Sequence, residues 1–286
     1  MKILHTISET RKYISQSRRE GKSVGLVPTM GYFHEGHLSL MRRAKIDNAL
    51  VVVSLFVNPT QFGPSEDFRQ YPRDLGRDSK MAESAGVDAI FNPSVEEMYP
   101  EGCRTYVEVG KLGDVLCGAS RPGHFKGVAT VVLKLFNIIQ ADRAYFGRKD
   151  YQQLRVIEQM VSDLNVPIEV IGMPIVREPD GLAMSSRNKY LNPEERKATL
   201  VLNKSLAYAQ GLVNEGVTSG DEIARRVGEF IAKEPLAQID YVAVVDPDTL
   251  DCVAEIQNQV VLALAVRIGK TRLIDNTLLM PARDVL

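Results

Sequence analysis

The chain has 286 residues, 44% of them hydrophobic, so it can form about two domains with packed cores. Lys and Arg number 35 against 36 Asp and Glu, and this balance gives no basic surplus for binding nucleic acid or an anionic membrane. The longest strongly apolar runs, Ala49–Val57 and Val260–Val266, are far shorter than the about 20 residues of a transmembrane helix.

The N-terminus and the cysteines indicate the compartment. Met1–Arg19 is mixed polar and lacks the apolar core of a signal peptide. Cys103, Cys117 and Cys252 are an odd number without metal-ligand spacing, which is typical of buried thiols in a reducing compartment. We therefore expect a cytoplasmic protein without a membrane or nucleic-acid partner.

Strand-length apolar runs alternate with helix-like stretches in the first 176 residues. The expected strands are Ser23–Pro28, Ala49–Val57, Ala89–Asn92, Arg143–Phe146 and Ile168–Val176. Helical faces are formed by Val128, Val131, Val132, Leu135 and Ile139, and by Leu154, Ile157, Val161 and Leu164. Strands that alternate with helices predict a Rossmann-like, doubly wound α/β domain with a parallel sheet over residues 1–176.

The pattern changes after residue 176. Asn192 followed by Pro193 and two glutamates is a helix start, and Ser219 with Glu222 has the spacing of a capping box. Three strand-like segments follow, namely Tyr241–Val245, Val260–Val266 and Thr271–Ile274. We predict a smaller α+β domain over residues 177–286 that acts as a lid, with the boundary between Val176 and Asn192.

The segment Pro28–His37 follows the first expected strand and opens a helix. Its glycines allow a close backbone approach, and the free N–H groups of a helix start attract an anion. His34 and His37, three residues apart, can add donors where negative charge develops. A glycine-rich connection with two incidental histidines is the alternative. A metal site is less favoured, because two histidines need a third ligand and none is recognisable.

Gly21-Lys22-Ser23 has the end of a Walker A sequence. Residue 16 is Gln where that motif needs Gly, and a strand follows the segment instead of preceding it. We interpret it as a turn that carries a helix-terminal lysine.

Two further segments flank the expected sheet. Phe56–Phe62 follows a strand, and Asn58 and Gln61 within it suit the hydroxyls or carboxylate of a small substrate; a polar turn ended by Pro59 is the alternative. Arg121–Val128 precedes an apolar helix, and its alternative is a helix-start loop with solvated cations.

Two more segments carry positive charge. In Phe146–Gln153, Lys149 can bind a phosphate, Asp150 can accept from ribose and Gln153 can reach a small polar substrate. In Met184–Asn188, two hydroxyls and a guanidinium can clamp a polyphosphate. A solvated helix start and a polar linker are the respective alternatives.

The sequence resembles a known family. The HxGH element at residues 34–37 and AMSSR at 183–187 resemble the nucleotidyltransferase superfamily that includes class I aminoacyl-tRNA synthetases, with Arg187 in place of the lysines of their KMSKS loop. Six ordered segments, PTMGYFHEGH, FVNPTQF, YPRD, RPGHFKGV, FGRKDYQQ and REPDGLAMSSRN, are similar to the pantothenate synthetase (pantoate–β-alanine ligase) family.

This resemblance implies a ligase of coenzyme A biosynthesis. It condenses pantoate with β-alanine through a pantoyl adenylate and releases AMP and pyrophosphate. ATP is a substrate, Mg²⁺ rests mainly on its phosphates without a protein metal site, and the enzyme is a homodimer.

The resemblance also implies residue roles. His37, His34 and Lys149 are the catalytic residues. Pantoate and β-alanine contacts fall on Gln61, Gln153 and Asn58. ATP contacts fall on Met30, Gly31, Tyr32, Phe33, His34, Glu35, Gly36, His37, Gly147, Arg148, Lys149, Asp150, Val176, Met184, Ser185, Ser186 and Arg187.

Three other functions are weighed against the ligase. A nucleotidyltransferase would transfer a nucleotidyl group to a small phosphorylated acceptor, but Gln61 and Gln153 favour a small polyol acid over such an acceptor. A tRNA-binding synthetase relative is disfavoured by the balanced charge. A non-catalytic nucleotide sensor is disfavoured because His37, Lys149 and Arg187 occur together.

Overall fold

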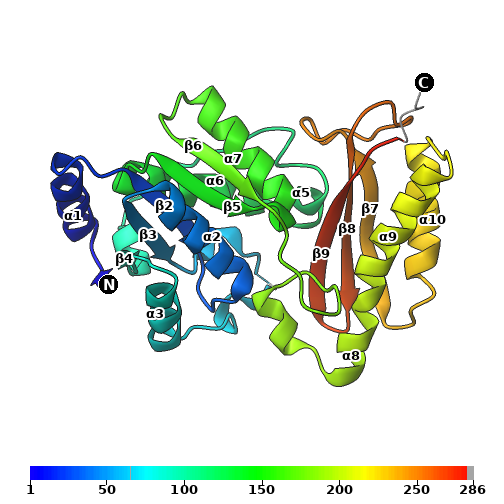
Figure 1. Ribbon diagram of the computed structural model, residues 1–286, viewed down its shortest axis with the longest axis horizontal. Helices are drawn as coiled ribbons and strands as arrows, with labels where there is room; N and C mark the ends of the chain where they lie inside the picture. The colour runs from blue at the N-terminus through cyan, green and yellow to red at the C-terminus, as the bar shows by residue number, and fades with distance from the viewer. Residues whose placement is uncertain (65, 282–286) are drawn as a thin grey trace. The chain divides into compact units, whose positions relative to one another are not determined.

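The computed structural model describes residues 1–64 and 66–281 and divides into two compact units (Figure 1). The first unit is Met1–Asp114, Arg121–Arg148 and Gln153–Val176. The second unit is Arg177–Leu286 together with two short segments, Val115–Ser120 and Lys149–Gln152. The division into domains of 1–176 and 177–286 stays a prediction.

A parallel sheet forms the first unit, in the strand order β1-β4-β3-β2-β5-β6. Its strands are β1 (Lys2–Leu4), β2 (Val24–Thr29), β3 (Leu50–Leu55), β4 (Ala89–Phe91), β5 (Arg143–Gly147) and β6 (Glu169–Met173). All residues of β3 are buried, as a strand covered on both faces requires. The predicted doubly wound α/β fold is confirmed.

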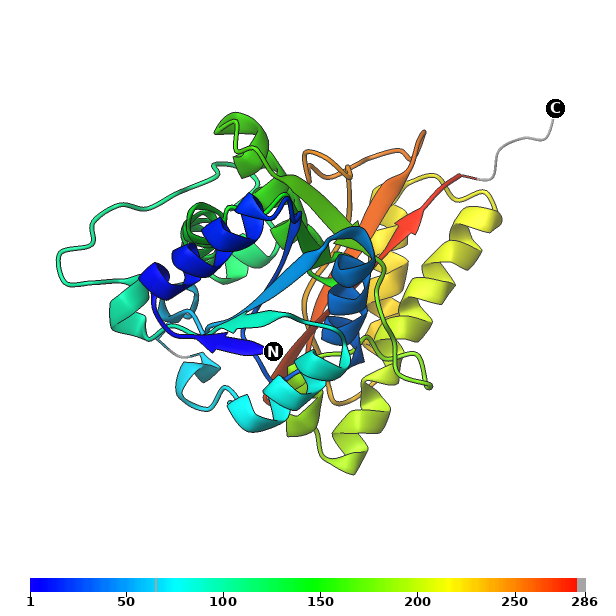
Figure 2. The same ribbon diagram turned by 60° about the vertical axis from the view of Figure 1, so that its left-hand side comes forward.

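Helices connect these strands. They are α1 (Ile7–Arg19), α2 (Glu35–Asp47), α3 (Leu75–Ser84), α4 (Val95–Met98), α6 (His124–Ile139) and α7 (Tyr151–Asp163), with short 3₁₀ turns η1 (Pro59–Gln61), η2 (Asp67–Arg69) and η3 (Arg148–Asp150). Helix α2 contacts α3, and α1 contacts α6 (Figure 2).

The strand order of the parallel sheet reverses between β2 and β5. After β2 the chain continues to β3 and β4 on one side of β2, whereas β5 lies on its other side. Ligands of open α/β sheets bind at such a point, beyond the carboxyl ends of the strands.

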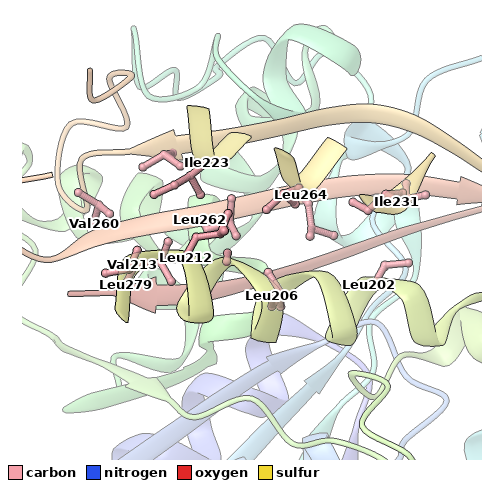
Figure 3. Close-up of a cluster of buried hydrophobic side chains, with 14 of the residues drawn as sticks. Leu202, Leu206, Leu212, Val213, Ile223, Ile231, Val260, Leu262, Leu264 and Leu279 are labelled. Carbon is pink, nitrogen blue, oxygen red and sulfur yellow. The ribbon is translucent and has the colours of Figure 1, made fainter. Parts of the chain in front are cut away.

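The second unit is an antiparallel sheet covered by helices. Its elements are β7 (Ala237–Val245), β8 (Val260–Ile268) and β9 (Thr271–Leu279), with α5 (Cys117–Ser120), η4 (Ser186–Tyr190), α8 (Pro193–Ala198), α9 (Leu200–Asn214) and α10 (Gly220–Ile231). Apolar side chains of α9, α10 and the sheet form one buried cluster, which includes Leu206, Ile223 and Leu264 (Figure 3). The predicted α+β architecture is confirmed.

Several sequence details are confirmed at the helix starts. Asn192 caps α8 in a complete capping box with Glu195, with Pro193 at the first position. Ser219 caps α10 by accepting the N–H of Glu222 at 3.2 Å. Gly21 lies in the turn between α1 and β2, as expected for a segment that is not a Walker A loop.

Other expectations were wrong. Cys103 and Cys252 are exposed, and only Cys117 is buried. Leu164 lies beyond the end of α7 and is 52% exposed, because the helix stops before it can join the apolar face. Strand β9 continues to Leu279, five residues past the predicted end at Ile274. Within residues 1–64 and 66–281, none of the helices has the length and apolar character needed to span a bilayer.

Candidate functional site

Three candidate segments meet the carboxyl edge of the parallel sheet in the first unit. Met30–His37 follows β2, the turn with Asn58 and Gln61 follows β3, and Gly147 ends β5. Because β2 and β5 are the neighbours at the reversal of strand order, the fold places these segments where ligands bind in doubly wound sheets.

The loop after β2 is held in a left-handed turn by a buried carboxylate. Gly31 has φ +89° and Tyr32 has φ +54°, values that disfavour most side chains. Asp78 of α3 accepts the N–H of Tyr32 at 2.6 Å and the N–H of Phe33 at 2.8 Å. Arg77 donates to the carbonyl oxygen of Phe33 at 2.7 Å. Burial raises the pKa of Asp78, although the two N–H donors oppose this shift.

His34 and His37 lie together at the start of α2. His34 is the N-cap residue, and its ring centroid is 4.1 Å from that of His37. The backbone N–H of His34 donates to Nδ1 of His37 at 3.3 Å. Because Nδ1 accepts, the proton of neutral His37 is on Nε2, which makes that atom a donor. Together with the helix N-terminus, this pair suits an anion.

Asn58 and Gln61 form a buried amide pair after β3. Asn58 Nδ2 donates to Gln61 Oε1 at 3.2 Å and to the carbonyl oxygen of Gly127 at 3.1 Å. Gln61 Nε2 donates to Sδ of Met30 at 3.2 Å, so the segments after β2 and β3 touch. Tyr99 donates its hydroxyl to Asn58 Oδ1 at 2.9 Å. With exposures of 1% and 9%, Asn58 and Gln61 are more than residues of a solvated turn.

Arg121 and His124 hold the backbone of this turn. His124 Nδ1 lies 2.8 Å from the carbonyl oxygen of Gln61, and Arg121 Nη2 donates to the same oxygen at 3.3 Å. Arg121 also binds Glu66 through two hydrogen bonds of 2.7 Å. Burial alone would raise the pKa of Glu66, but the Arg121 guanidinium outweighs it and the pKa is lowered. The motif is the helix-start loop of the alternative interpretation, but its Arg121 is paired and only 17% exposed and is not a solvated cation.

Lys149 and Asp150 lie in η3 and belong to the second unit. Asn276 of β9 donates its Nδ2 to the carbonyl oxygen of Lys149 at 2.9 Å. The buried Gln152 amide accepts from the N–H of Cys117 at 3.0 Å and donates to the carbonyl oxygen of Val115 at 2.7 Å. These bonds explain why both short segments cluster with the second unit.

The segment Met184–Arg187 directly follows a hydrogen-bonded hairpin in the second unit. Residues Arg177 and Ala183 form a β-bridge across the turn. Asn188 donates to Glu178 Oε1 at 2.7 Å, and Arg196 donates to Glu178 Oε2 at 2.9 Å. Ser185 caps η4 by accepting the N–H of Arg187 at 3.3 Å, which places both hydroxyl and guanidinium residues at one short turn.

The contacts join some of the predicted site residues directly. Met30, Asn58 and Gln61 form one connected group, His34 and His37 a second, and Ser185 and Arg187 a third. Gln153 is half-buried in α7, Arg148 and Glu35 are exposed, and Val176 ends the first unit.

Four residues that support these groups were missed by sequence reasoning. They are Glu66, Asp78, Asp275 and Asn276. Each is a single polar residue within or beside an element, so neither spacing nor periodicity distinguishes it from a solvated side chain.

The whole chain is similar to proteins of one known family. A family model described as pantoate-beta-alanine ligase matches residues 2–278. The pantothenate synthetase of Moorella thermoacetica is 58% identical over 279 residues, covering 98% of this chain and 99% of that protein. The crystal structure of pantothenate synthetase from Thermus thermophilus has a TM-score of 0.92 at 48% identity, over 97% of this chain and 99% of that one.

A second solved structure carries ligands. It is the pantoate-beta-alanine ligase from Francisella tularensis complexed with beta-gamma ATP and beta-alanine. Its TM-score is 0.80 at 35% identity, and the match covers 97% of each chain.

Proposed function

Because the chain belongs to the pantoate–beta-alanine ligase family, we infer that it condenses pantoate with β-alanine to pantothenate and consumes ATP. The observation that carries this conclusion is the family match over residues 2–278, which includes every segment placed at the carboxyl edge of the parallel sheet. A nucleotidyltransferase that keeps the nucleotide on its product is not favoured by these relatives.

We propose a reaction in two steps. An oxygen of the pantoate carboxylate attacks the α-phosphorus of ATP, a new P–O bond forms, and pyrophosphate leaves with the electrons of the broken P–O bond. The amine of β-alanine then attacks the acyl carbon of pantoyl adenylate, AMP leaves, and the amine loses a proton. The substrate carboxylate is the nucleophile, so the mechanism needs no covalent link to the protein.

Residues of the first unit would hold the reacting groups. A carboxylate and a triphosphate repel each other, so donors must offset negative charge before attack. His34, His37 and the start of α2 can donate to phosphate oxygens, and Nε2 carries the proton of neutral His37. Gln61 and Gln153 offer amide groups for the hydroxyls and carboxylate of pantoate, and Asn58, whose amide bonds to Gln61, Gly127 and Tyr99, would act by holding Gln61.

Residues of the second unit would add positive charge and hydroxyl donors. Lys149, Ser185, Ser186 and Arg187 are suited to phosphate oxygens, and Asp150 can accept from ribose. A preorganised donor of this kind stabilises a transition state by about 3–4 kcal/mol.

Mg²⁺ enters this proposal as part of the nucleotide substrate. Among residues 1–64 and 66–281, no three His, Cys, Asp or Glu side chains are grouped to bind a metal. Bound to the triphosphate and water, the ion would neutralise phosphate charge. We also propose, on family resemblance alone, a cytoplasmic homodimer.

Pyrophosphate exchange tests the adenylation step. With pantoate and Mg-ATP but without β-alanine, we expect labelled pyrophosphate to enter ATP. Because each loses a preorganised phosphate donor, Lys149→Ala and His37→Ala should lower the exchange rate by about 100- to 1,000-fold and change thermal stability little. Lys22→Ala, in the Walker-like turn, is the control and should match the wild type. Absence of exchange in folded wild type would contradict the adenylate, and near-wild-type exchange in both variants would contradict the residue assignment.

A further inference from the structure

Strand β9 carries two adjacent buried polar residues, Asp275 and Asn276, in its middle. Asp275 is 2% exposed and Asn276 is 7% exposed. Strand alternation places Asp275 on the same face as Leu273 and Leu279, which belong to the core under α9 and α10. A carboxylate at a core-facing position loses its hydration and destabilises a fold unless polar groups surround it. Packing alone therefore does not account for this aspartate.

The main partner of Asp275 is Arg177, whose guanidinium group binds the carboxylate through two hydrogen bonds. Arg177 donates Nη1 to Oδ2 at 2.7 Å and Nη2 to Oδ1 at 3.0 Å. Nη1 also donates to the carbonyl oxygen of Gly181 at 3.0 Å. Gly181 has φ +94° and lies in the turn that leads into Met184–Arg187. Arg177 therefore fastens β9 to the base of this hairpin.

Asn276 acts on the other face of the strand, since successive strand residues point to opposite faces. Its Nδ2 donates to the carbonyl oxygen of Lys149 at 2.9 Å, and its own N–H donates to Asp275 Oδ1 at 2.9 Å. Two adjacent residues thus hold two segments that are distant in the sequence. Both segments carry charge that the proposed function directs at phosphates.

We propose that Asp275 and Asn276 are positioning residues for adenylation. Asp275 sets the Met184–Arg187 segment through Arg177, and Asn276 sets the backbone of Lys149. This inference rests on the proposed function, which gives these two segments their phosphate contacts. Both side chains are buried and bond to protein groups, so each acts by keeping a cationic segment in register with the β7–β9 sheet. A displacement of about 1 Å at a reacting group lowers rates by about 100-fold.

Steady-state kinetics of Asp275→Asn test the inference, with Asp240→Asn as a matched control. Asp240 lies on β7, the other outer strand of the sheet, and also pairs with an arginine of β9, Arg272, at 2.8 Å; its other partner is Ser120. We expect Asp275→Asn to lower kcat/KM for ATP in the exchange reaction by about 30- to 100-fold and to leave KM for pantoate within about twofold. Asp240→Asn should stay within about threefold of the wild type.

A double-mutant cycle tests whether Asn276 acts through Lys149. If it does, Asn276→Ala lowers exchange by about tenfold alone but changes the rate of Lys149→Ala by less than about twofold. Additive losses would contradict this role. A merely structural role would not produce this non-additivity.

The outcomes separate the two proposals. Suppose that the wild type exchanges pyrophosphate and that folded Asp275→Asn keeps the wild-type kcat/KM for ATP. This result would overturn the positioning role and leave the ligase function intact. Equal losses in Asp275→Asn and Asp240→Asn would also overturn it. If Asp275→Asn fails to fold, Arg177→Lys is tested in its place, because lysine keeps the positive charge but cannot form the two parallel hydrogen bonds of the guanidinium group. Wild type without exchange would instead refute the adenylation step itself.

Discussion

The two segments proposed to meet the phosphates are held in different ways. Met30–His37 depends on one fully buried carboxylate, Asp78, which binds two backbone N–H groups of a left-handed turn. Met184–Arg187 depends on several side chains: the Arg177–Asp275 pair, and the partly exposed Glu178 and Arg196, whose side chains are 29% and 26% exposed. The first arrangement concentrates its stability in one residue, and the second distributes it.

The pKa shifts of the carboxylates that support the two segments have opposite directions. Burial raises the pKa of Asp78, because the backbone donors and Arg77 do not fully replace water. The Arg196 guanidinium lowers the pKa of Asp180, in the hairpin before Met184–Arg187, and the two oppositely charged groups lie 2.6 Å apart. A buried carboxylate that binds backbone groups is therefore costly to ionise, whereas a paired surface carboxylate is not.

The largest expected effect follows from removing the single anchor of the first segment. Asp78→Ala leaves two backbone N–H groups without their acceptor, so we expect a loss of about 2–5 kcal/mol in the free energy of unfolding. The turn before His34 should shift, and exchange should fall by about 100-fold. Glu178→Gln, in the distributed segment, should lose only about 1 kcal/mol. Urea unfolding and pyrophosphate exchange measure both effects.

Asp74→Ala is the control for this comparison. Asp74 caps the same helix, α3, by accepting the N–H of Arg77 at 2.9 Å, but it is exposed. Its loss should lower stability by about 1 kcal/mol and leave exchange unchanged. Equal effects of Asp74→Ala and Asp78→Ala on exchange would show that α3, and not the buried carboxylate, sets the turn.

A smaller effect is expected in the pH dependence of stability. Because folding raises the pKa of Asp78, the folded state favours the protonated carboxyl group. This proton-linked contribution to the free energy of unfolding is present below the unfolded-state pKa and is lost as pH rises through the folded-state pKa. The lowered pKa of Asp180 means that its contribution is present above the unfolded-state pKa and is lost as pH falls through the folded-state pKa. The difference in stability between the wild type and Asp78→Asn should fall as the pH rises. The difference in stability between the wild type and Asp180→Asn should increase as the pH rises. Thermal unfolding between about pH 3 and pH 7 measures both slopes, and slopes of one sign would contradict the contrast.

Sequence patterns predicted the strands and the segments at their ends because these features repeat along the chain. Apolar runs identified β2, β3 and β8, and the glycine and histidine spacing placed His34 at a helix start. The residues that support the site lack such patterns. The predicted strand Thr271–Ile274 stops before Asp275 and Asn276, yet β9 continues through both, although Asp and Asn are common in turns. The turn preference of Asp and Asn is overridden here by tertiary hydrogen bonds to Arg177 and to the backbone of Lys149.

Oxygen transfer tests the central claim, that an oxygen of the pantoate carboxylate bonds to the α-phosphorus and leaves with AMP. Pantoate labelled with ¹⁸O in its carboxylate is turned over with Mg-ATP and β-alanine, and the nucleotide product is analysed by mass spectrometry. The account predicts AMP that carries one ¹⁸O atom and pantothenate that keeps the other. Unlabelled AMP, or ¹⁸O in inorganic phosphate with ADP as the nucleotide product, would contradict it.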